Sequence, residues 1–377
     1  MARVLFINRG FAGADFGGAR VSQRNFEIIS GFCEVEPFDA KYIWSDASLM
    51  KKSVKMVLAG NYIFIKREIK EIYKKIRTGG FDVIFIDASY IGMFARYAKR
   101  HSSARVVVFF HNTEVHNFVC TKSTGNEFNF GIFTRLQRMI CKRFCIKNER
   151  AALKFADKII LLNARDMVDL GRYYPREMRR IDKAKFSIIP ISLRDDMTEA
   201  DVTKAKAEAT HTPPLGLFIG AFFPPNIEGL DWFVKNVAGR TDARYVFAGK
   251  DLDKVAAQLA APNVTVLGRQ ADLKAVYMDA DFALSPLFSG SGMKTKTVEA
   301  MMYGKTIFAT DEGFSGFEAD FERVGARANT AEEFVKAIND FATKGRKFNE
   351  YSRKVYLEGY SNEAVADKFK AVLCGDC

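Results

Sequence analysis

The chain alternates short, continuously apolar runs with longer helix-like stretches, in two series separated by a polar break. In the first half the predicted strands are 2–8, 82–87, 104–110, 158–162 and 186–191. In the second half they are 215–220, 244–250, 263–269, 281–287 and 305–310. Strands buried on both faces of a parallel sheet read as unbroken apolar runs. The pattern therefore predicts an α/β protein with two doubly wound, Rossmann-like domains that face each other across a cleft.

Helices are predicted between these strands, at 19–31, 66–78, 90–101, 135–156, 164–172, 226–238, 251–259, 271–279, 293–303, 331–342 and 362–373. The break at 195–214 is polar and ends in two prolines, so we interpret it as a linker or hinge. A length of 377 residues suits two domains. We expect a first domain at 1–192 and a second at 193–359, with a last helix, about 360–377, able to pack back on the first.

Composition narrows the class of protein. An apolar fraction of 48% and a charged fraction of 27% are those of a soluble globular chain. No apolar run approaches the roughly 20 residues that cross a bilayer, and the opening MARVLFINRG indicates a strand and not a secretory signal. The six cysteines are scattered, and the one CxxC pair, Cys374 and Cys377, has no second pair with it. They are interpreted as free thiols in a reducing cytoplasm, and no metal site is predicted.

The net charge of +12 is held unevenly. Residues 1–192 carry 34 Lys and Arg against 18 Asp and Glu, and residues 193–377 carry 23 against 27. A basic half indicates a surface that meets something anionic, either nucleic acid or an anionic membrane face. The basic residues are interleaved with apolar ones, which favours basic amphipathic helices at a membrane over a nucleic-acid tail. Ordinary solvated helix faces remain the alternative.

Candidate binding residues are sought just after each strand, because ligands of open parallel sheets sit at the carboxyl ends of the strands. A glycine-containing loop with Gly17 and Gly18 follows the first strand and precedes a helix, where backbone N–H groups can approach an anion. Its spacing does not match G-x-G-x-x-G, and a simple flexible loop is the alternative. His111 follows strand 104–110, where an imidazole can hydrogen-bond a sugar hydroxyl or a developing charge. A lone histidine is more often a structural hydrogen-bonding residue, and that is the alternative for His111.

The segment 285–304 is the richest in chemistry. A loop of small residues leads into a helix whose first turn carries Lys294 and Lys296. Cations are unfavourable at a helix N-terminus unless they share an anion, such as a diphosphate, with the exposed N–H groups. Glu299 follows one to two turns later and can accept two hydrogen bonds from a ribose diol. The alternative is an ordinary capped helix with surface lysines.

These motifs resemble the GT-B superfamily of glycosyltransferases, and within it the retaining family 4-like group (glycosyltransferase group 1). The resemblance spans most of the chain and is strongest in LFIGAFFPPNIEGLDWF, in VTVLGRQADLKAVYMDADFALSPLFSGSGMKTKTVEAMMYGKTIFAT and in EGFSG. In the first half, the glycine loop, HNTE at 111–114 and ERAALKFADKIILLN at 149–163 follow in the expected order.

The resemblance implies roles for individual residues. Glu299 matches the second glutamate of the E-x7-E motif, which holds the donor ribose, and His111 matches the histidine near the reacting sugar. Lys294 and Lys296 lie where cations meet the diphosphate and are the other expected catalytic residues. The remaining expected donor contacts are Gly17, Gly18, Gly268, Arg269, Ser291, Gly292 and Met293.

Two departures from the family pattern stand out. The first glutamate of E-x7-E would fall at position 291, which is Ser291 in the GSGMKTK loop of this chain. The Arg and Lys pair that commonly follows the first strand of the second domain is replaced by 221–226, which holds no cation. We therefore expect the positive charge near the phosphates to come from Lys294 and Lys296.

The sequence thus predicts a metal-independent and cofactor-free glycosyltransferase that uses a nucleotide-sugar donor. Its acceptor is expected to be a glycan or a lipid-linked glycan in cell-surface polysaccharide or glycolipid synthesis, reached from the cytoplasm at the inner membrane face, with no nucleic acid as partner. Retention of configuration is expected from the resemblance. A UDP-sugar epimerase of the same architecture and a non-catalytic nucleotide-sugar-binding module are the alternatives.

Overall fold

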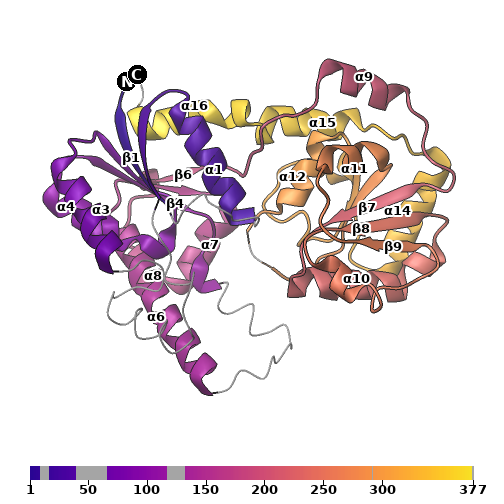
Figure 1. The fold of residues 1–377 in the computed structure, drawn as a ribbon, viewed down its shortest axis with the longest axis horizontal. Coiled ribbons are helices and arrows are strands. Elements are labelled where there is room, and N and C mark those ends of the chain that lie inside the picture. Colours follow the sequence, from indigo (N-terminus) through magenta and orange to yellow (C-terminus); the bar gives the residue numbers. More distant parts are fainter. Residues whose placement is uncertain (9–16, 40–65, 117–131, 291, 376–377) are drawn as a thin grey trace. The chain divides into compact units, whose positions relative to one another are not determined.

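The computed structural model describes residues 1–8, 17–39, 66–116, 132–290 and 292–375 (Figure 1). The chain divides into two compact units. Unit 1 comprises Met1–Pro190 and Val365–Cys377, and unit 2 comprises Ile191–Ala364. The boundaries expected from the sequence were 192 and 359.

Unit 1 contains a six-stranded parallel sheet with the strand order β2-β1-β3-β4-β5-β6. Its strands are β1 (Arg3–Asn8), β2 (Glu34–Asp39), β3 (Val83–Ile86), β4 (Arg105–Phe110), β5 (Lys158–Leu161) and β6 (Phe186–Ile188). Its helices are α1 (Gly17–Ser30), α3 (Lys66–Thr78), α4 (Met93–His101), α6 (Ile132–Phe155), α7 (Ala164–Tyr173), α8 (Pro175–Met178) and most of α16 (Asn362–Cys374).

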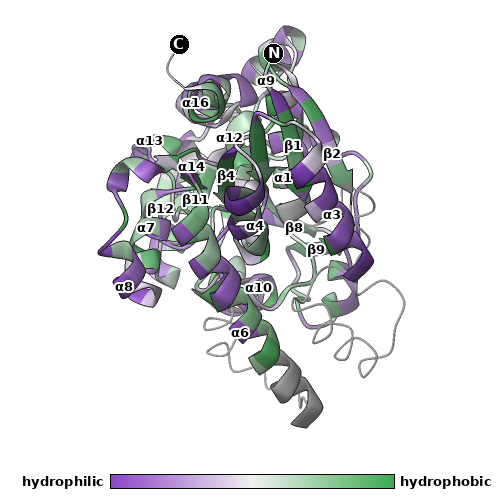
Figure 2. Ribbon diagram, turned by 90° about the vertical axis from the view of Figure 1, so that its left-hand side faces the viewer, coloured by the Kyte–Doolittle hydropathy of each residue, from purple (hydrophilic) through white to green (hydrophobic). Residues whose placement is uncertain are grey.

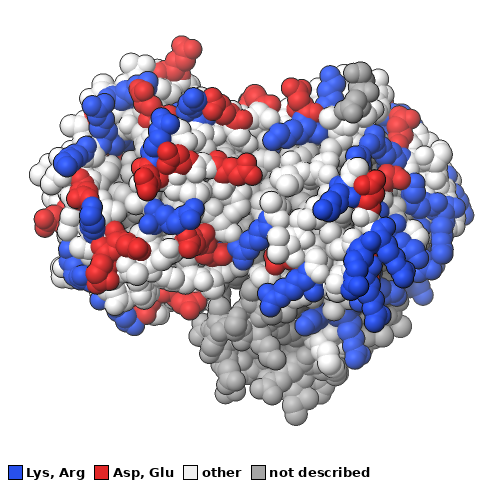
Figure 3. All heavy atoms as spheres, turned by 180° about the vertical axis from the view of Figure 1, so that it is seen from behind, with Lys and Arg blue, Asp and Glu red and all other residues white. Residues whose placement is uncertain are grey.

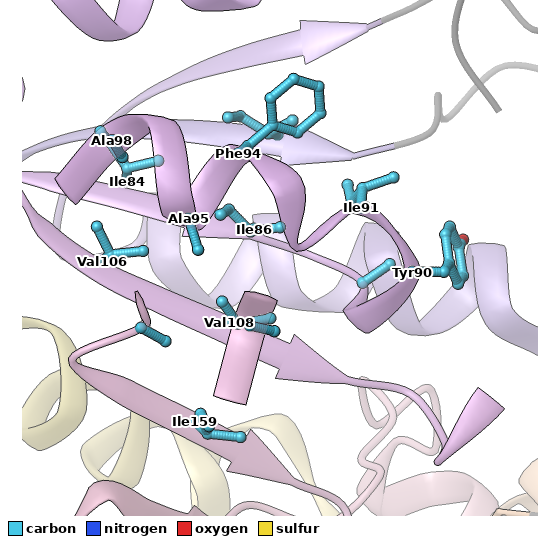
Figure 4. Packing of buried hydrophobic residues seen from close by; sticks show 14 of the residues in the cluster. Ile84, Ile86, Tyr90, Ile91, Phe94, Ala95, Ala98, Val106, Val108 and Ile159 are labelled. Carbon is cyan, nitrogen blue, oxygen red and sulfur yellow. The ribbon is translucent and has the colours of Figure 1, made fainter. Parts of the chain in front are cut away.

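The core of unit 1 lies between the sheet and the helices that cover it. The central strands are fully buried, and apolar side chains of α3 and α4 pack on them, as Phe94 and Ala95 do on Ile84 and Ile86 (Figure 4). Hydrophobic residues gather on β1 and β4, whereas α3 shows hydrophilic residues on its outer side (Figure 2). This two-sided burial explains why the strands read as unbroken apolar runs.

Helix α16 closes the other side of the unit 1 sheet. Its Phe369 stacks on Phe109 of β4 with ring centroids 6.3 Å apart, and it also contacts Phe85 of β3. The guanidinium of Arg24, from α1, lies 5.8 Å from the Phe109 ring and 5.6 Å from the Phe369 ring. The chain therefore leaves unit 1 at Pro190 and returns to it at Val365.

Unit 2 contains a second six-stranded parallel sheet, with the order β12-β11-β10-β7-β8-β9. Its strands are β7 (Leu215–Ile219), β8 (Arg244–Ala248), β9 (Val264–Leu267), β10 (Phe282–Ser285), β11 (Thr306–Ala309) and β12 (Gly325–Arg327). Its helices are α9 (Glu199–Ala207), α10 (Pro224–Asn236), α11 (Leu273–Asp279), α12 (Thr295–Met302), α13 (Phe321–Val324), α14 (Ala331–Lys344) and α15 (Glu350–Val355). Aromatic residues, among them Phe233, Phe247 and Phe282, fill its core.

Two sheets of this kind confirm the predicted fold class, and all ten predicted strands are present. Three local predictions were wrong. Part of the polar break forms α9, because Thr198 and Asp201 make a reciprocal capping box at its start. The helix expected at 251–259 is a short 3₁₀ turn, Leu252–Val255, which follows Asp251 in the left-handed region at φ 62°. Edge strands β2 and β12 were not predicted at all.

None of the helices in the described part of the chain combines the length and the apolar character needed to span a membrane.

Candidate functional site

The strand order of unit 2 locates a binding site. Chain connections run in opposite directions on either side of β7 and β10, which are neighbours in the sheet although far apart in sequence. Ligands of doubly wound sheets bind outside the carboxyl ends of the strands at such a switch point. The segments that leave these ends are 220–223, which leads into α10, and 286–294, which leads into α12. Both segments contain residues that the sequence singled out.

Lys296 lies in the first turn of α12, at this switch point. Its Nζ donates to Oδ1 of Asn226, from α10, at 2.8 Å, and lies 4.0 Å from the centre of the Phe218 ring. A side chain at Gly220 would bring its Cβ within 3.0 Å of that Nζ. The absence of a side chain at Gly220 therefore leaves room for the ammonium group beside the end of β7.

Two effects lower the pKa of Lys296 to about 7: burial, which is the larger, and the neighbouring charge of Lys294. Glu299 acts in the opposite direction. Burial disfavours the charged form of Lys296. A bound anion would favour that form and raise the pKa again, so the site should attract an anion. The N-terminus of α12 has no side-chain cap, so its first N–H groups add to the attraction for an anion.

Lys294 is already engaged. Its Nζ forms an ion pair with Glu312 at 2.7 Å and donates to the carbonyl oxygen of Gly292 at 2.9 Å. The side chains of Lys294 and Glu312 are only 10% and 15% exposed. This pairing makes Lys296 the stronger candidate for contact with a diphosphate.

Glu299 lies one turn further along α12 and is 6% exposed. Its Oε2 accepts a hydrogen bond from the hydroxyl of Tyr277, in α11, at 3.0 Å. A buried carboxylate on the same short helix as Lys296 combines one acceptor group with one cation. That combination suits a ligand that carries hydroxyl groups next to a phosphate.

The loop before α12 needs glycine. Gly292 adopts φ 64°, which side chains rarely accept, and a Cβ on Gly290 would contact Lys294 and Glu312. Met293 is buried, and Ser291 lies outside the described residues. Gly268 and Arg269 follow β9, where Arg269 is exposed.

The other predicted site residues lie in unit 1, whose own switch point is between β1 and β3, next to β4. Gly17 and Gly18 are the first residues of α1, and the loop before them lies outside the described residues. His111 follows β4, and its Nε2 lies 2.7 Å from the backbone oxygen of Asp87. A carbonyl oxygen only accepts, so Nε2 carries the proton, and in the neutral ring Nδ1 is an acceptor for a hydroxyl.

Asp87 and Glu149 hold this region in place. The buried carboxylate of Asp87 accepts a hydrogen bond from Nδ2 of Asn25 at 2.6 Å and lies 3.4 Å from Nε2 of His111. Glu149, fully buried in α6, accepts hydrogen bonds from the backbone N–H of Glu114 at 2.7 Å and from Oγ of Ser89 at 3.0 Å. It also accepts one from the hydroxyl of Tyr174. Burial raises the pKa of Glu149 to about 7 in spite of these bonds.

Replacing Glu149 with glutamine is expected to make the protein more stable relative to the wild type at pH 8 than it is at pH 5. Folded Glu149 keeps its proton up to a pKa of about 7, whereas its ordinary pKa is 4.5. Between these values the folded state binds more protons, so the free energy of unfolding falls as pH rises, by roughly 3 kcal/mol for this group. Glutamine has no proton to lose. The difference in melting temperature between variant and wild type should therefore grow more positive from pH 5 to pH 8.

The matched control is the exposed Glu71→Gln, which should follow the wild type at every pH. A constant difference between Glu149→Gln and the wild type across this range would contradict the protonated state of Glu149.

Asn226, Tyr277, Asp87 and Glu312 were not predicted as site residues. Glu312 and Asp87 each had a usable signal, since both directly or closely follow a strand, where the other candidates were sought. Asn226 and Tyr277 lie within helices and reach the site only through packing. Among the described residues, no group of three or more His, Cys, Asp and Glu side chains is placed to hold a metal ion.

Comparisons with known proteins identify the architecture. Residues 213–344 match the family Glycosyl transferases group 1. Sucrose-phosphate synthase from Thermosynechococcus elongatus has a similar structure, with a TM-score of 0.69 and 16% identity over 99% of this chain and 98% of that one. HepE from Anabaena, solved in complex with UDP-glucose, gives a TM-score of 0.63 and 13% identity with both chains covered completely. The lipopolysaccharide outer core galactosyltransferase WaaB gives 0.62 and 12%, with 99% of each chain covered.

No curated protein matches the chain in sequence. The structural similarities, all at low identity, show that the chain has the fold of these GT-B proteins, with two parallel sheets.

Proposed function

We propose that the chain is a glycosyltransferase that transfers a sugar from a nucleotide-sugar donor, because residues 213–344 match the family Glycosyl transferases group 1 and the whole chain has the fold of GT-B proteins. The acceptor is a glycan or a lipid-linked glycan, in the synthesis of a cell-surface polysaccharide or glycolipid, and the configuration of the sugar is retained. The observation that carries the proposal is the placement of Lys296 and Glu299 on one helix at the switch point of unit 2. The UDP-glucose complex of HepE supports the class of donor.

Different residues of unit 2 bind different parts of the donor. The ribose diol donates to Glu299, and the diphosphate lies against Lys296 and the first N–H groups of α12. When the bond between the sugar and the diphosphate breaks, negative charge builds on the leaving phosphate oxygen, and these groups stabilise it. The acceptor hydroxyl then forms the new bond to the sugar from the same face, and its proton passes to that phosphate oxygen. His111, in unit 1, offers Nδ1 as an acceptor for a sugar hydroxyl.

Lys296 supplies the positive charge that a metal ion provides elsewhere, so we propose that the reaction needs no metal and no further cofactor. The test is incubation with a panel of nucleotide sugars, with and without lipid-linked acceptors, in the presence of EDTA. Sugar transfer supports the proposal. Epimerised donor would instead identify an epimerase, and thermal stabilisation by nucleotide without any product would identify a binding module.

A basic face on unit 1 supports an acceptor at a membrane. Helix α3 contacts α4, and α4 contacts α6. Their exposed cations are Lys66, Arg67, Lys70, Lys74, Arg77, Arg96, Lys99, Arg100, Arg143, Lys147, Arg150 and Lys154, and they form the basic face. Among the described side chains of these three helices, Glu71 is the single exposed acidic one. Figure 3 shows Lys and Arg gathered over unit 1, on the right, whereas both charges mix over unit 2.

The apolar residues of α3 do not contribute to such binding. Ile69, Ile72 and Ile76 are buried against the sheet. We therefore propose that the basic face holds the protein at the inner membrane face by electrostatic attraction to anionic lipids, from the cytoplasm.

Binding to vesicles that contain anionic lipid is expected to fall by at least tenfold between 50 and 500 mM salt, because screening acts on exposed charges. Sedimentation with vesicles measures it, and vesicles of neutral lipid alone should bind little at either salt concentration. Partition that does not respond to salt would contradict an electrostatic contact. Lys70→Glu with Lys74→Glu should weaken binding, while Lys336→Glu with Lys344→Glu, on α14 of unit 2, should not.

A further inference from the structure

Tyr277 lies beneath the residues proposed to bind the donor. It comes from α11, is 2% exposed, and its aromatic ring stacks on that of Tyr303 with centroids 4.8 Å apart. Because the ring is buried and stacked, the position of its hydroxyl is fixed by the protein core. The hydroxyl is therefore a rigid donor that ligand binding does not need to order.

That hydroxyl faces α12, the helix that carries Lys296 and Glu299. It donates to Oε2 of Glu299 at 3.0 Å, and the backbone oxygen of Lys296 lies 3.4 Å away. The hydroxyl has one proton, so the shorter contact, to the carboxylate, is the main hydrogen bond. Hydrogen bonds to charged groups are stronger than those between neutral groups.

A glutamate side chain has three rotatable bonds, and ordering it costs conformational entropy. A fixed donor that holds one carboxylate oxygen before the ligand arrives lowers that cost at the moment of binding. The orientation of Glu299 relative to α12 is then determined by α11, a separate element.

We propose that Tyr277 is a positioning residue for the ribose site: it holds the carboxylate of Glu299 in the orientation that accepts hydrogen bonds from the ribose hydroxyls of a nucleoside diphosphate. This inference rests on the proposed function, in which Glu299 binds the ribose. Tyr277 acts through Glu299 and does not itself contact the ligand.

Tyr303 provides a matched control. It is equally buried, at 2% exposed, and belongs to the same stacked pair. Its hydroxyl donates to Oδ2 of Asp196 at 2.7 Å, however, and not to Glu299. Replacing either tyrosine with phenylalanine removes one buried hydroxyl from the same pair, but only Tyr277→Phe removes a hydrogen bond to the carboxylate of Glu299.

The experiment measures the dissociation constants of two ligands by calorimetry. The first is whichever of UDP, GDP, ADP and CDP binds the wild type most tightly, and the second is its 2′-deoxy counterpart. The ratio of the two constants reports ribose recognition and is independent of the fraction of active protein. The wild type is expected to prefer the ribonucleotide by about tenfold or more, the worth of a hydrogen bond to a charged group.

Tyr277→Phe is expected to lower this preference to about threefold or less, mainly because it binds the ribonucleotide more weakly than the wild type does. Its melting temperature should be close to that of the wild type. Tyr303→Phe should keep the preference of the wild type. An unchanged preference in Tyr277→Phe would overturn the positioning role while leaving the proposed function intact. An equal loss of the ribose preference in both variants would show that Tyr277 has only a structural role. A wild type that binds none of the diphosphates, or does not prefer ribose, would overturn the role of Glu299 as well.

Discussion

Replacing Glu299 with alanine is expected to weaken the binding of the nucleotide-sugar donor by roughly 100-fold or more and to lower kcat/KM by a similar factor. The carboxylate is proposed to accept two hydrogen bonds from the ribose, and each bond to a charged group contributes about 1.5–3 kcal/mol. The alanine variant also leaves the Tyr277 hydroxyl without its carboxylate acceptor. Calorimetry with the nucleoside diphosphate and initial rates with the donor measure the two effects.

Glu332→Ala is the control for this experiment, since its side chain is 73% exposed and lies on α14. It should bind the donor like the wild type. Full activity in Glu299→Ala would reject the assignment of the ribose site, whatever the behaviour of the control.

Replacing Lys296 with methionine is expected to reduce kcat by roughly 100- to 1,000-fold, the usual effect of losing one group that stabilises developing charge. Methionine keeps an unbranched apolar side chain that can pack on Phe218, so folding should survive, and the melting temperature checks this. Lys294→Met should cost less in kcat, because the ammonium of Lys294 is already paired with Glu312. A larger loss in Lys294→Met than in Lys296→Met would reverse the roles assigned to the two lysines.

The same residue should make donor binding depend on pH. The pKa of Lys296 is about 7 without ligand, so its side chain is charged below this pH and increasingly neutral above it. A diphosphate favours the charged form, so binding above pH 7 must take up a proton, and affinity falls as pH rises towards 9. Calorimetry in two buffers of different ionisation enthalpy detects that proton. Lys296→Arg stays charged throughout, and should bind without proton uptake.

The pattern of apolar runs was sufficient to predict both sheets, because strands buried on two faces have a composition that helices and loops lack. It failed at the sheet edges. Strand β2 reads EVEPFD, with two glutamates, an aspartate and Pro37, and such a segment forms a strand only where one side of its backbone needs no partner. Strand β12 has three residues, too few for any periodicity to show.

Some features of the candidate site could likewise be predicted from the sequence, and others could not. Lys294, Lys296 and Glu299 could be selected from the sequence because they follow a strand within one continuous segment. The pairing of Lys294 with Glu312 could not, because it joins residues 18 positions apart in sequence across two loops. The contact between Tyr277 and Glu299 depends on how α11 packs on α12, which local patterns do not encode.

The return of the chain to unit 1 has a consequence for the order of folding during synthesis. The first 190 residues of unit 1 leave the ribosome before unit 2, but Phe369, which covers Phe85 and Phe109, follows only after Ile191–Ala364 has been made. At 5–20 residues per second that interval is roughly 10–35 s. Throughout it, the face of the sheet that α16 later covers, with the guanidinium of Arg24 beside it, is open to solvent, so the first unit to emerge is the last to be completed.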